Sequence, residues 1–365
     1  MREGRIDGIE TLRGLAALGV VLCHVFGQFY GFTRFSAGPE RVLGWAGQVG
    51  VAVFFVVSGF CIRLPMARAL AADPRARLDV RRYLARRARR ILPPYWVAII
   101  LSIAVGLISP IGLLDGGHGL LDIGLHLVGL HTLTPGSINS INGVFWTIGL
   151  EIQFYLAYLL LAHRPATPLK GLALMVVAVV AYGVASVAFP NPSPWRVVGQ
   201  AFVLVTLWQW YLGAVLADLY VRHAAAFAAA PVPAAWAVRL FAAAALVVLG
   251  LGDPEWMRVH PAYWLLPLAA AAAVVGALMG PSRSKARLGA MGALGQASYS
   301  LYLLHPAVLG LVVLAARTWN WPIWVSTPVA IVGAVVAALI AYRLIERPFM
   351  AQPGRRTSTA PAAAE

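Results

Sequence analysis

Long runs of apolar residues, separated by short polar segments, recur along the whole chain. A run of about 20 apolar residues is long enough to cross the hydrocarbon core of a bilayer as an α-helix. The pattern therefore predicts an all-α, polytopic membrane protein with about ten transmembrane helices. The expected spans are residues 11–30, 46–64, 92–112, 144–162, 171–188, 199–220, 233–250, 262–280, 297–316 and 323–344.

Composition and charge agree with this pattern. The chain has 365 residues, of which 60% are hydrophobic and 12% charged, whereas soluble domains carry about a quarter charged residues. The net charge of +15 could suit nucleic acid, but the 29 Lys and Arg residues gather in alternate loops, as the positive-inside rule requires. With the N-terminus in the cytoplasm, 24 of them fall inside and 5 outside. We therefore expect two cytoplasmic termini, the lipid bilayer as partner and no nucleic acid.

We expect one membrane domain over residues 1–350 and a disordered cytoplasmic tail over 351–365, which is rich in Pro, Ala and Thr. No small-residue cleavage site follows the first apolar run, so this run is predicted to be a retained span rather than a signal peptide. Cys23 and Cys61 both fall within expected spans, and we expect no disulfide between them.

Ionisable side chains inside apolar spans are candidates for function, because burying them in lipid is costly. The topology places His24, Glu151 and His305 at similar depth. Arg13 precedes His24 by eleven residues, so both side chains share one helix face about 16 Å apart. On spacing alone, Arg13 could equally be an anchor at the interface, and His24 a hydrogen-bonding contact between helices.

Two further spans present polar faces. Thr147, Glu151 and Tyr155 recur every four residues in "NGVFWTIGLEIQFYL", which places a carboxyl group beside aromatic rings. In "LGQASYSLYLLHPAV", Tyr302 and His305 share a face just before a proline. Such stripes either line a cavity or join helices through polar contacts.

Small residues and arginines mark two other stretches. "GVAVFFVVSGFCIR" interleaves small residues such as Ser58 with phenylalanines, which by itself indicates close helix packing. "YLARRARRILPPYW" contains four arginines before two prolines, which are expected to separate an interfacial segment from the span. Clustered guanidinium groups can bind phosphates, or they can bind anionic lipid at the interface.

Two polar stretches favour simpler interpretations. His118, Asp122 and His126 are spaced four residues apart, and His131 follows. They would form a metal site only on a helix, and the surrounding glycines disfavour one, so solvated loop residues are expected. "LIERPFM" ends the last span with Glu346 in what is expected to be a helix stop with surface charges.

Together these features resemble the acyltransferase-3 family of bacterial integral-membrane acyltransferases. The resemblance runs from residue 5 to about 350. The matching features, in the family's order, are Arg13 and His24 at their spacing, "GVAVFFVVSGF", the arginines before "ILPPYW", "FWTIGLEIQFY", "SYSLYLLHP" and "IERP". The family's ten-helix core agrees with the predicted number of spans. One departure is Thr147, where relatives often have serine.

The resemblance implies an O-acyltransferase of the bacterial cytoplasmic (inner) membrane. Such enzymes move an acyl group, most often acetyl from acetyl-CoA, to a hydroxyl of an envelope glycan, a lipid-linked sugar or a small molecule. His24 is expected to act as general base or as acyl carrier, and Glu151 is expected to orient or charge-balance it. We expect no metal. The expected acyl-CoA-binding residues are Arg13, Ser58, Arg86, Arg87, Arg89 and Arg90, and the expected substrate-positioning residues are Trp146, Tyr155, Tyr302 and His305.

A proton-coupled transporter of an organic anion is the alternative, because ten spans, intramembrane Glu and His residues and a basic inner mouth also suit that class. The sequence shows no inverted repeat, which counts against it. A degenerate member without activity is the third possibility. The acceptor, the acyl chain and the oligomeric state are left open.

Overall fold

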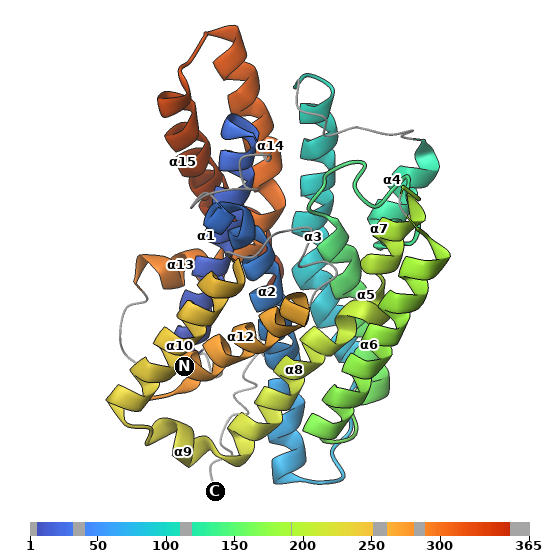
Figure 1. The fold of residues 1–365 in the computed structure, drawn as a ribbon, viewed down its shortest axis with the longest axis vertical. Coiled ribbons are helices and arrows are strands. Elements are labelled where there is room, and N and C mark those ends of the chain that lie inside the picture. Colours follow the sequence, from blue (N-terminus) through green and yellow to red (C-terminus); the bar gives the residue numbers. More distant parts are fainter. Residues whose placement is uncertain are drawn as a thin grey trace, which may run out of the picture.

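A computed structural model describes residues 6–31, 41–109, 119–190, 192–250, 261–280 and 289–350. Every regular element in these ranges is helical (Figure 1), as the apolar pattern predicts. The expected tail, residues 351–365, lies outside the described residues. The helices are α1 (Asp7–Tyr30), α2 (Arg41–Ala72), α3 (Val80–Gly106), α4 (Leu120–Val128), α5 (Trp146–Leu161), α6 (Pro168–Ala188), α7 (Trp195–Gln200), α8 (Val203–Arg222), α9 (Ala224–Ala228), α10 (Val232–Gly250), α12 (Pro261–Leu278), α13 (Ala290–Gln296), α14 (Ser298–Thr318), α15 (Ile323–Ala341) and α16 (Arg347–Met350).

Each of the ten expected spans coincides with a helix. In the described parts of the chain, eight helical stretches are long and apolar enough to cross a membrane, and the other two, Trp146–Leu161 and Trp264–Leu278, are shorter apolar helices. The protein is therefore an all-α, polytopic membrane protein. One detail differs from expectation, because α3 runs unbroken through Pro93 and Pro94. The arginine segment and the span that follows are thus a single helix.

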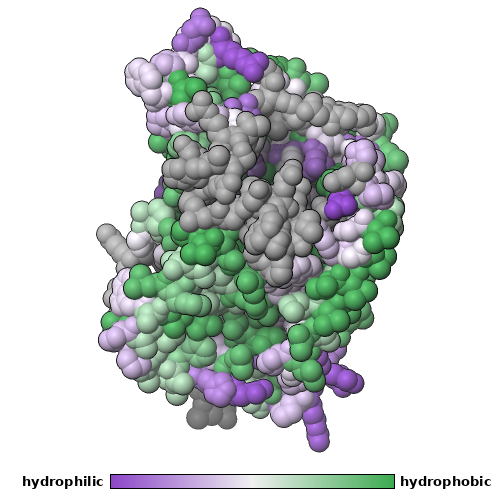
Figure 2. All heavy atoms as spheres, in the orientation of Figure 1, coloured by the Kyte–Doolittle hydropathy of each residue, from purple (hydrophilic) through white to green (hydrophobic). Residues whose placement is uncertain are grey.

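The outer helices present apolar side chains to the surroundings. In each of the helices α6 and α10, only 11% of an 18-residue apolar stretch is buried inside the protein. Val180, Leu240 and Phe241 on these helices are exposed. Figure 2 shows hydrophobic residues over much of the visible flank and hydrophilic residues gathered toward its top and bottom. Such a belt is expected of a surface that contacts lipid.

Glycines allow the central helices to pack closely. A Cβ atom at Gly50 would meet the Ala16 carbonyl of α1 and the Val20 side chain. Gly59 and Gly213 form a reciprocal contact between α2 and α8, because a Cβ atom on either would collide with backbone of the other helix. Small residues in this segment therefore bring helices together, as one interpretation of the sequence predicts.

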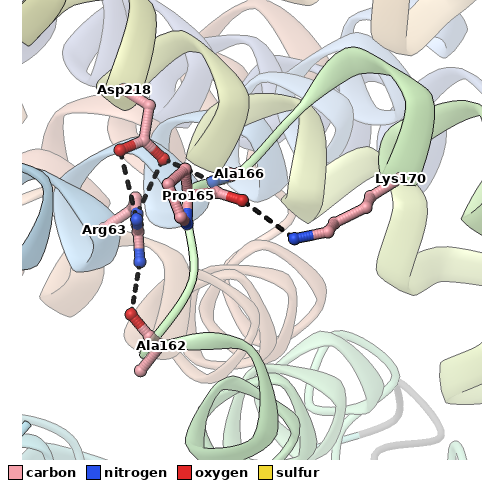
Figure 3. A network of polar contacts seen from close by, with 6 residues as sticks. All are labelled: Arg63, Ala162, Pro165, Ala166, Lys170 and Asp218. Carbon is pink, nitrogen blue, oxygen red and sulfur yellow. Dashed lines mark hydrogen bonds and ion pairs between the residues drawn. The ribbon is translucent and has the colours of Figure 1, made fainter.

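A buried ion pair fixes α2 to α8 and to the connection between α5 and α6 (Figure 3). Arg63 is 1% exposed, and its Nε donates to Asp218 on α8 over 2.8 Å. Its Nη1 donates to the Ala162 carbonyl over 2.6 Å, while the Ala166 amide donates to Asp218 over 2.8 Å. Arg63 is therefore part of the core.

Candidate active site

A cavity that opens to solvent lies between α1, α2, α3, α5 and α14, with about 770 Å³ of empty space when its open mouth is included. Most of the wall is apolar, with polar groups at a few positions. The residues that line it are Arg13, Val51, Phe54, Phe55, Val57, Ser58, Cys61, Ile62, Arg87, Arg90, Ile91, Thr147, Ile148, Glu151, Tyr155, Ser298, Tyr299 and Tyr302.

One end of the cavity, which we call the arginine end, carries Arg13, Arg87 and Arg90. Arg87 and Arg90 are three residues apart on α3 and therefore share a helix face. Arg86 and Arg89 lie on another face of α3, where they are exposed and do not line the cavity. The structure thus brings three of the five arginines of the predicted site together and leaves two outside.

Glu151 lies in the cavity wall with two hydroxyl partners. Ser58 on α2 donates to its Oε1 over 3.1 Å, and the Tyr155 hydroxyl, one turn along α5, makes a short hydrogen bond to the same oxygen. The Trp210 indole of α8 in turn donates to Ser58 over 3.3 Å. The carboxylate therefore organises a polar strip that runs from α5 through α2 to α8.

The opposite end of the cavity is closed by Phe54 and Tyr302, whose rings meet edge to face with centroids 5.9 Å apart. The Tyr302 hydroxyl accepts from Thr147 over 2.9 Å and donates to the Val144 carbonyl over 3.1 Å. Tyr302 is thus pinned to the start of α5. Phe54 packs at the junction of three hydrophobic clusters and makes no hydrogen bond that would fix its ring.

His24 and His305 lie beyond this closure. Their ring centroids are 5.0 Å apart, and His305 follows Tyr302 by one helical turn, with ring centroids 6.0 Å apart. The Nδ1 atom of His24 bonds to the Val20 carbonyl over 2.9 Å. His305 is 1% exposed, and its Nδ1 bonds to the Tyr302 carbonyl over 2.9 Å. The depth match predicted from the topology is therefore a direct contact between two of the three groups.

The third group is placed differently. No hydrogen bond or ion pair joins the described side chains of Glu151 and His24, because Glu151 is held by Ser58 and Tyr155. Trp146 also stays outside the main cavity. It lines a smaller pocket beside Gln48 and Gln209 and meets Phe55 edge to face. The structure therefore shows no direct contact through which Glu151 would orient His24.

The expectation of surface charges at the end of the last span is wrong for Glu346. A π-helical turn over Tyr342–Glu346 precedes α16, and Glu346 is buried at 1% exposure. Its Oε2 accepts from Ser300 over 2.8 Å, and its carboxylate interacts electrostatically with Arg90. π-Helical turns often mark functional sites. Glu346 therefore balances the positive charge near the arginine end.

The expectation of solvated loop residues around Asp122 is also wrong. Asp122 and His126 lie on α4, and both are buried together with His131. The rings of His126 and His131 stack with centroids 4.1 Å apart. Burial and the neighbouring His126 lower the pKa of His131 to about 3, and its Nε2–H donates to the Phe145 carbonyl over 3.0 Å.

Glycine at the ends of α4 explains this difference. Gly119 caps the start of α4, and Gly129 ends it with φ of 74°, a conformation that favours glycine. His118 lies outside the described residues. In the part of the chain that the structure describes, no group of three His, Cys, Asp or Glu side chains could hold a metal ion. Cys23 and Cys61 are both free, as expected.

Comparisons with known proteins agree with this geometry. A family model described as "Acyltransferase domain", of the acyltransferase-3 family, matches residues 6–343. The chain belongs to the acyltransferase-3 family. By family it is therefore an O-acyltransferase, an enzyme that uses an acyl donor and sits in a bilayer as a multi-pass protein.

Three relatives are similar over nearly their whole length. The exopolysaccharide production protein ExoZ of Rhizobium meliloti (strain 1021) is 28% identical over 320 residues, which cover 86% of this chain and 93% of that protein. The acyltransferase MdmB of Streptomyces mycarofaciens is 27% identical, covering 99% and 96%. Nodulation protein 10 of Rhizobium leguminosarum bv. viciae is 24% identical, covering 95% and 94%. No solved structure matches the chain.

Proposed function

We propose that this enzyme moves an acyl group, acetyl in the first instance, from cytoplasmic acyl-CoA to a hydroxyl of an envelope glycan, a lipid-linked sugar or a small molecule. The proposed setting is the bacterial inner membrane, with both termini in the cytoplasm. One observation carries this proposal. A largely apolar cavity has three arginines at one end, and a pair of histidines lies just beyond the other end.

The arginine end suits the polyanionic part of coenzyme A. Guanidinium groups bind phosphates through paired hydrogen bonds, and Arg13, Arg87 and Arg90 converge on the cavity from two helices. Glu10 lies 3.5 Å from Arg13 and holds its guanidinium group near this end of the cavity. The long, thin pantetheine arm would lie along the apolar wall formed by α2, with Ser58 and Tyr155 as polar partners.

The thioester would then arrive at Phe54 and Tyr302, one helical turn from the histidines. Tyr302 is held by Thr147 and Val144, so Phe54 is the side chain that turns aside. Nδ1 of His24 donates to a carbonyl, which leaves Nε2 as the reacting nitrogen in either route, as general base or as acyl carrier.

In the general-base route, the acceptor oxygen forms a bond to the acyl carbon while its proton passes to Nε2 of His24. The carbon–sulfur bond breaks, and the sulfur leaves with the electron pair. The proton then passes to the sulfur, which gives a free thiol and returns His24 to its neutral form. Glu151 takes part as a positioning residue, because it holds Ser58 and Tyr155 along the path of the donor.

The test is release of free thiol from acetyl-CoA by the purified full-length enzyme in detergent. We expect wild type to release thiol without any ion gradient, and we expect His24→Ala to lose at least about a hundredfold in rate, as removal of a general base does. His223→Ala is the matched control, since His223 is exposed at the end of α8. Full activity in a folded His24→Ala variant would refute this assignment, whichever chemical route His24 uses.

A further inference from the structure

The outward side of α3 forms a single stripe along the helix. Because α3 runs unbroken through Pro93 and Pro94 (Figure 1), residues that share a face can be followed along its whole length. At about 100° per residue, positions spaced three or four apart stay within roughly 40° of one direction around the axis. The stripe, which we call the exposed stripe, contains Arg82, Arg86, Arg89, Pro93, Trp96 and Ile100. All of these side chains except that of Pro93, which is partly buried, are exposed.

The exposed stripe changes character along its length. Its first part is made of arginines, and after Pro93 it continues with Trp96, which is 42% exposed, and Ile100, which is 67% exposed. The opposite side of α3 is buried, through residues such as Tyr95 and Ala98. The arginines of the exposed stripe therefore point in the same direction as the apolar surface of the span, and away from the cavity.

The depth of these arginines can be estimated along the helix axis. The expected span begins at residue 92, so Arg89 and Arg86 lie about 4.5 and 9 Å before it at 1.5 Å per residue. The headgroup region extends roughly 5–8 Å beyond the hydrocarbon core on each side. Arg89 therefore lies at headgroup depth, and Arg86 reaches this depth with its long side chain.

The positive charge of the exposed stripe is only partly balanced by the protein. Among the residues that the structure describes, none makes a hydrogen bond or an ion pair with the guanidinium groups of Arg86 and Arg89. Arg82 and Arg87 act on Arg86 as neighbouring positive charges, and Asp79 acts on it as a negative one. The Asp79 carboxylate also caps α3 by accepting from the Arg82 amide over 2.9 Å. An anion between the arginines would remove the repulsion that remains.

We propose that Arg86 and Arg89, with Arg82 beside them, bind the headgroup phosphate of an anionic phospholipid, whose acyl chain lies along Trp96 and Ile100. Guanidinium groups bind phosphate oxygens in pairs, and basic segments next to a span attract anionic lipid. The apolar continuation of the stripe is what selects a lipid over a free phosphate. This inference goes beyond the proposed function and does not rest on it, because Arg87 and Arg90 face the cavity from a different side of α3.

The test measures lipid binding to the purified full-length protein in detergent by native mass spectrometry. The probes are dioleoylphosphatidylglycerol and dioleoylphosphatidylcholine, which share their acyl chains and differ in net charge. We expect the anionic lipid to bind wild type at least about tenfold more tightly, since each arginine near a membrane surface contributes about fivefold. The double variant Arg86→Gln, Arg89→Gln should lose at least about tenfold in affinity for the anionic lipid, and less than about threefold for the zwitterionic one.

The matched control is the double variant Arg75→Gln, Arg77→Gln. It removes the same charge from exposed positions on the connection between α2 and α3, and it should keep its affinity for the anionic lipid within about threefold of wild type. Equal losses in the two double variants would overturn the proposal, because net charge alone would then attract the lipid. Melting temperatures of both variants should match wild type, since all four side chains are exposed.

Two further outcomes would also overturn the proposal. The first is the absence of any preference for the anionic lipid in wild type. The second is displacement of this lipid by an equal concentration of glycerophosphoglycerol, its headgroup without acyl chains, which would show that the arginines bind a soluble phosphate ester. None of these measurements needs turnover, so the result is independent of whether the enzyme releases thiol from acetyl-CoA.

Discussion

His24 on α1 and His305 on α14 lie 5.0 Å apart between ring centroids, on the far side of Tyr302 from the cavity. Tyr302 contacts both regions, because it lines the cavity and its ring meets that of His305. In the proposed function, a donor held at the arginine end would reach the histidines past Tyr302 and Phe54. Donor binding and chemistry would then involve different residues, which makes the two separately testable.

The two faces of α3 provide a direct test of donor binding. Arg87→Ala or Arg90→Ala should raise the KM for acetyl-CoA by roughly 10- to 100-fold, because each removes a charge-assisted hydrogen bond to phosphate. Arg86→Ala and Arg89→Ala are matched controls on the exposed face of the same helix and should change KM less than about threefold. Steady-state thiol release measures both. Equal effects on the two faces would mean that α3 attracts the donor through its charge alone.

Phe54 should control which acyl chains pass. Phe54→Leu removes an aromatic ring from the closed end of the cavity, so longer chains should gain relative to acetyl. We expect the ratio of kcat/KM for butyryl-CoA over acetyl-CoA to rise about tenfold, since a methylene in a pocket is worth about 1–3 kcal/mol. Phe241→Leu, on the exposed flank, is the control and should leave the ratio unchanged. An unchanged ratio in Phe54→Leu would show that donors enter by another route.

The ion pair of Arg63 and Asp218 should be needed for stability rather than chemistry. Arg63→Ala leaves the Asp218 carboxylate buried without its partner, which should lower the free energy of unfolding by about 3–5 kcal/mol. The double variant Arg63→Leu, Asp218→Leu should lose less than either single variant, because no uncompensated charge remains. Arg68→Ala, exposed on the same helix, is the control. Melting temperatures in detergent measure each of these variants and the single variants Arg63→Leu and Asp218→Leu, and additive losses would contradict the coupling.

Acid should weaken the buried contacts around α4 through His131. The folded protein holds the pKa of His131 at about 3, whereas an unfolded histidine titrates near 6.5. Between these two pH values the unfolded chain binds a proton that the folded chain does not. The contribution of His131 to the free energy of unfolding is therefore fully present above about pH 6.5 and is lost as the pH drops toward 3. The expected loss is up to about 1.4 kcal/mol per pH unit.

Melting temperatures between pH 7 and pH 5 measure this loss. His131→Gln keeps a donor for the Phe145 carbonyl but cannot be protonated in this range, so its melting temperature should fall less steeply with pH. His223→Gln, at an exposed site, should follow wild type. A His131→Gln variant with the wild-type slope would show that another group titrates instead.

The local spacings of the sequence predicted much of the site. Thr147, Glu151 and Tyr155 all line the cavity, because residues four apart share a helix face. The same periodicity places Arg87 and Arg90 on a different face of α3 from Arg86 and Arg89. The prediction that all four arginines bind the donor did not use this difference. Contacts between helices could not be predicted in this way. The pairing of His24 with His305, and the engagement of Glu151 by Ser58, depend on how α1, α2, α5 and α14 pack together.

The helix around Asp122 and the burial of Glu346 could not be predicted, because the general rules that apply to their sequences have local exceptions. Glycines near Asp122 argue against a helix in general, yet Gly119 and Gly129 are the caps that begin and end α4. In the sequence, Glu346 follows an apolar span and precedes Arg347 and Pro348, a pattern found at the ends of many helices. In the structure Glu346 lies in a π-helical turn and accepts a hydrogen bond from Ser300 on α14, a tertiary contact that the sequence alone does not reveal.

The reciprocal contact of Gly59 and Gly213 has a mechanical consequence. The backbones of α2 and α8 are in contact, and Arg63 is bonded across them. These two helices therefore form a rigid pair along one side of the cavity. Widening of the cavity must then come from displacement of α1, α3, α5 or α14 relative to this pair of helices. In the proposed function, the donor arm would therefore lie against a fixed wall, α2, whatever movement the other helices make.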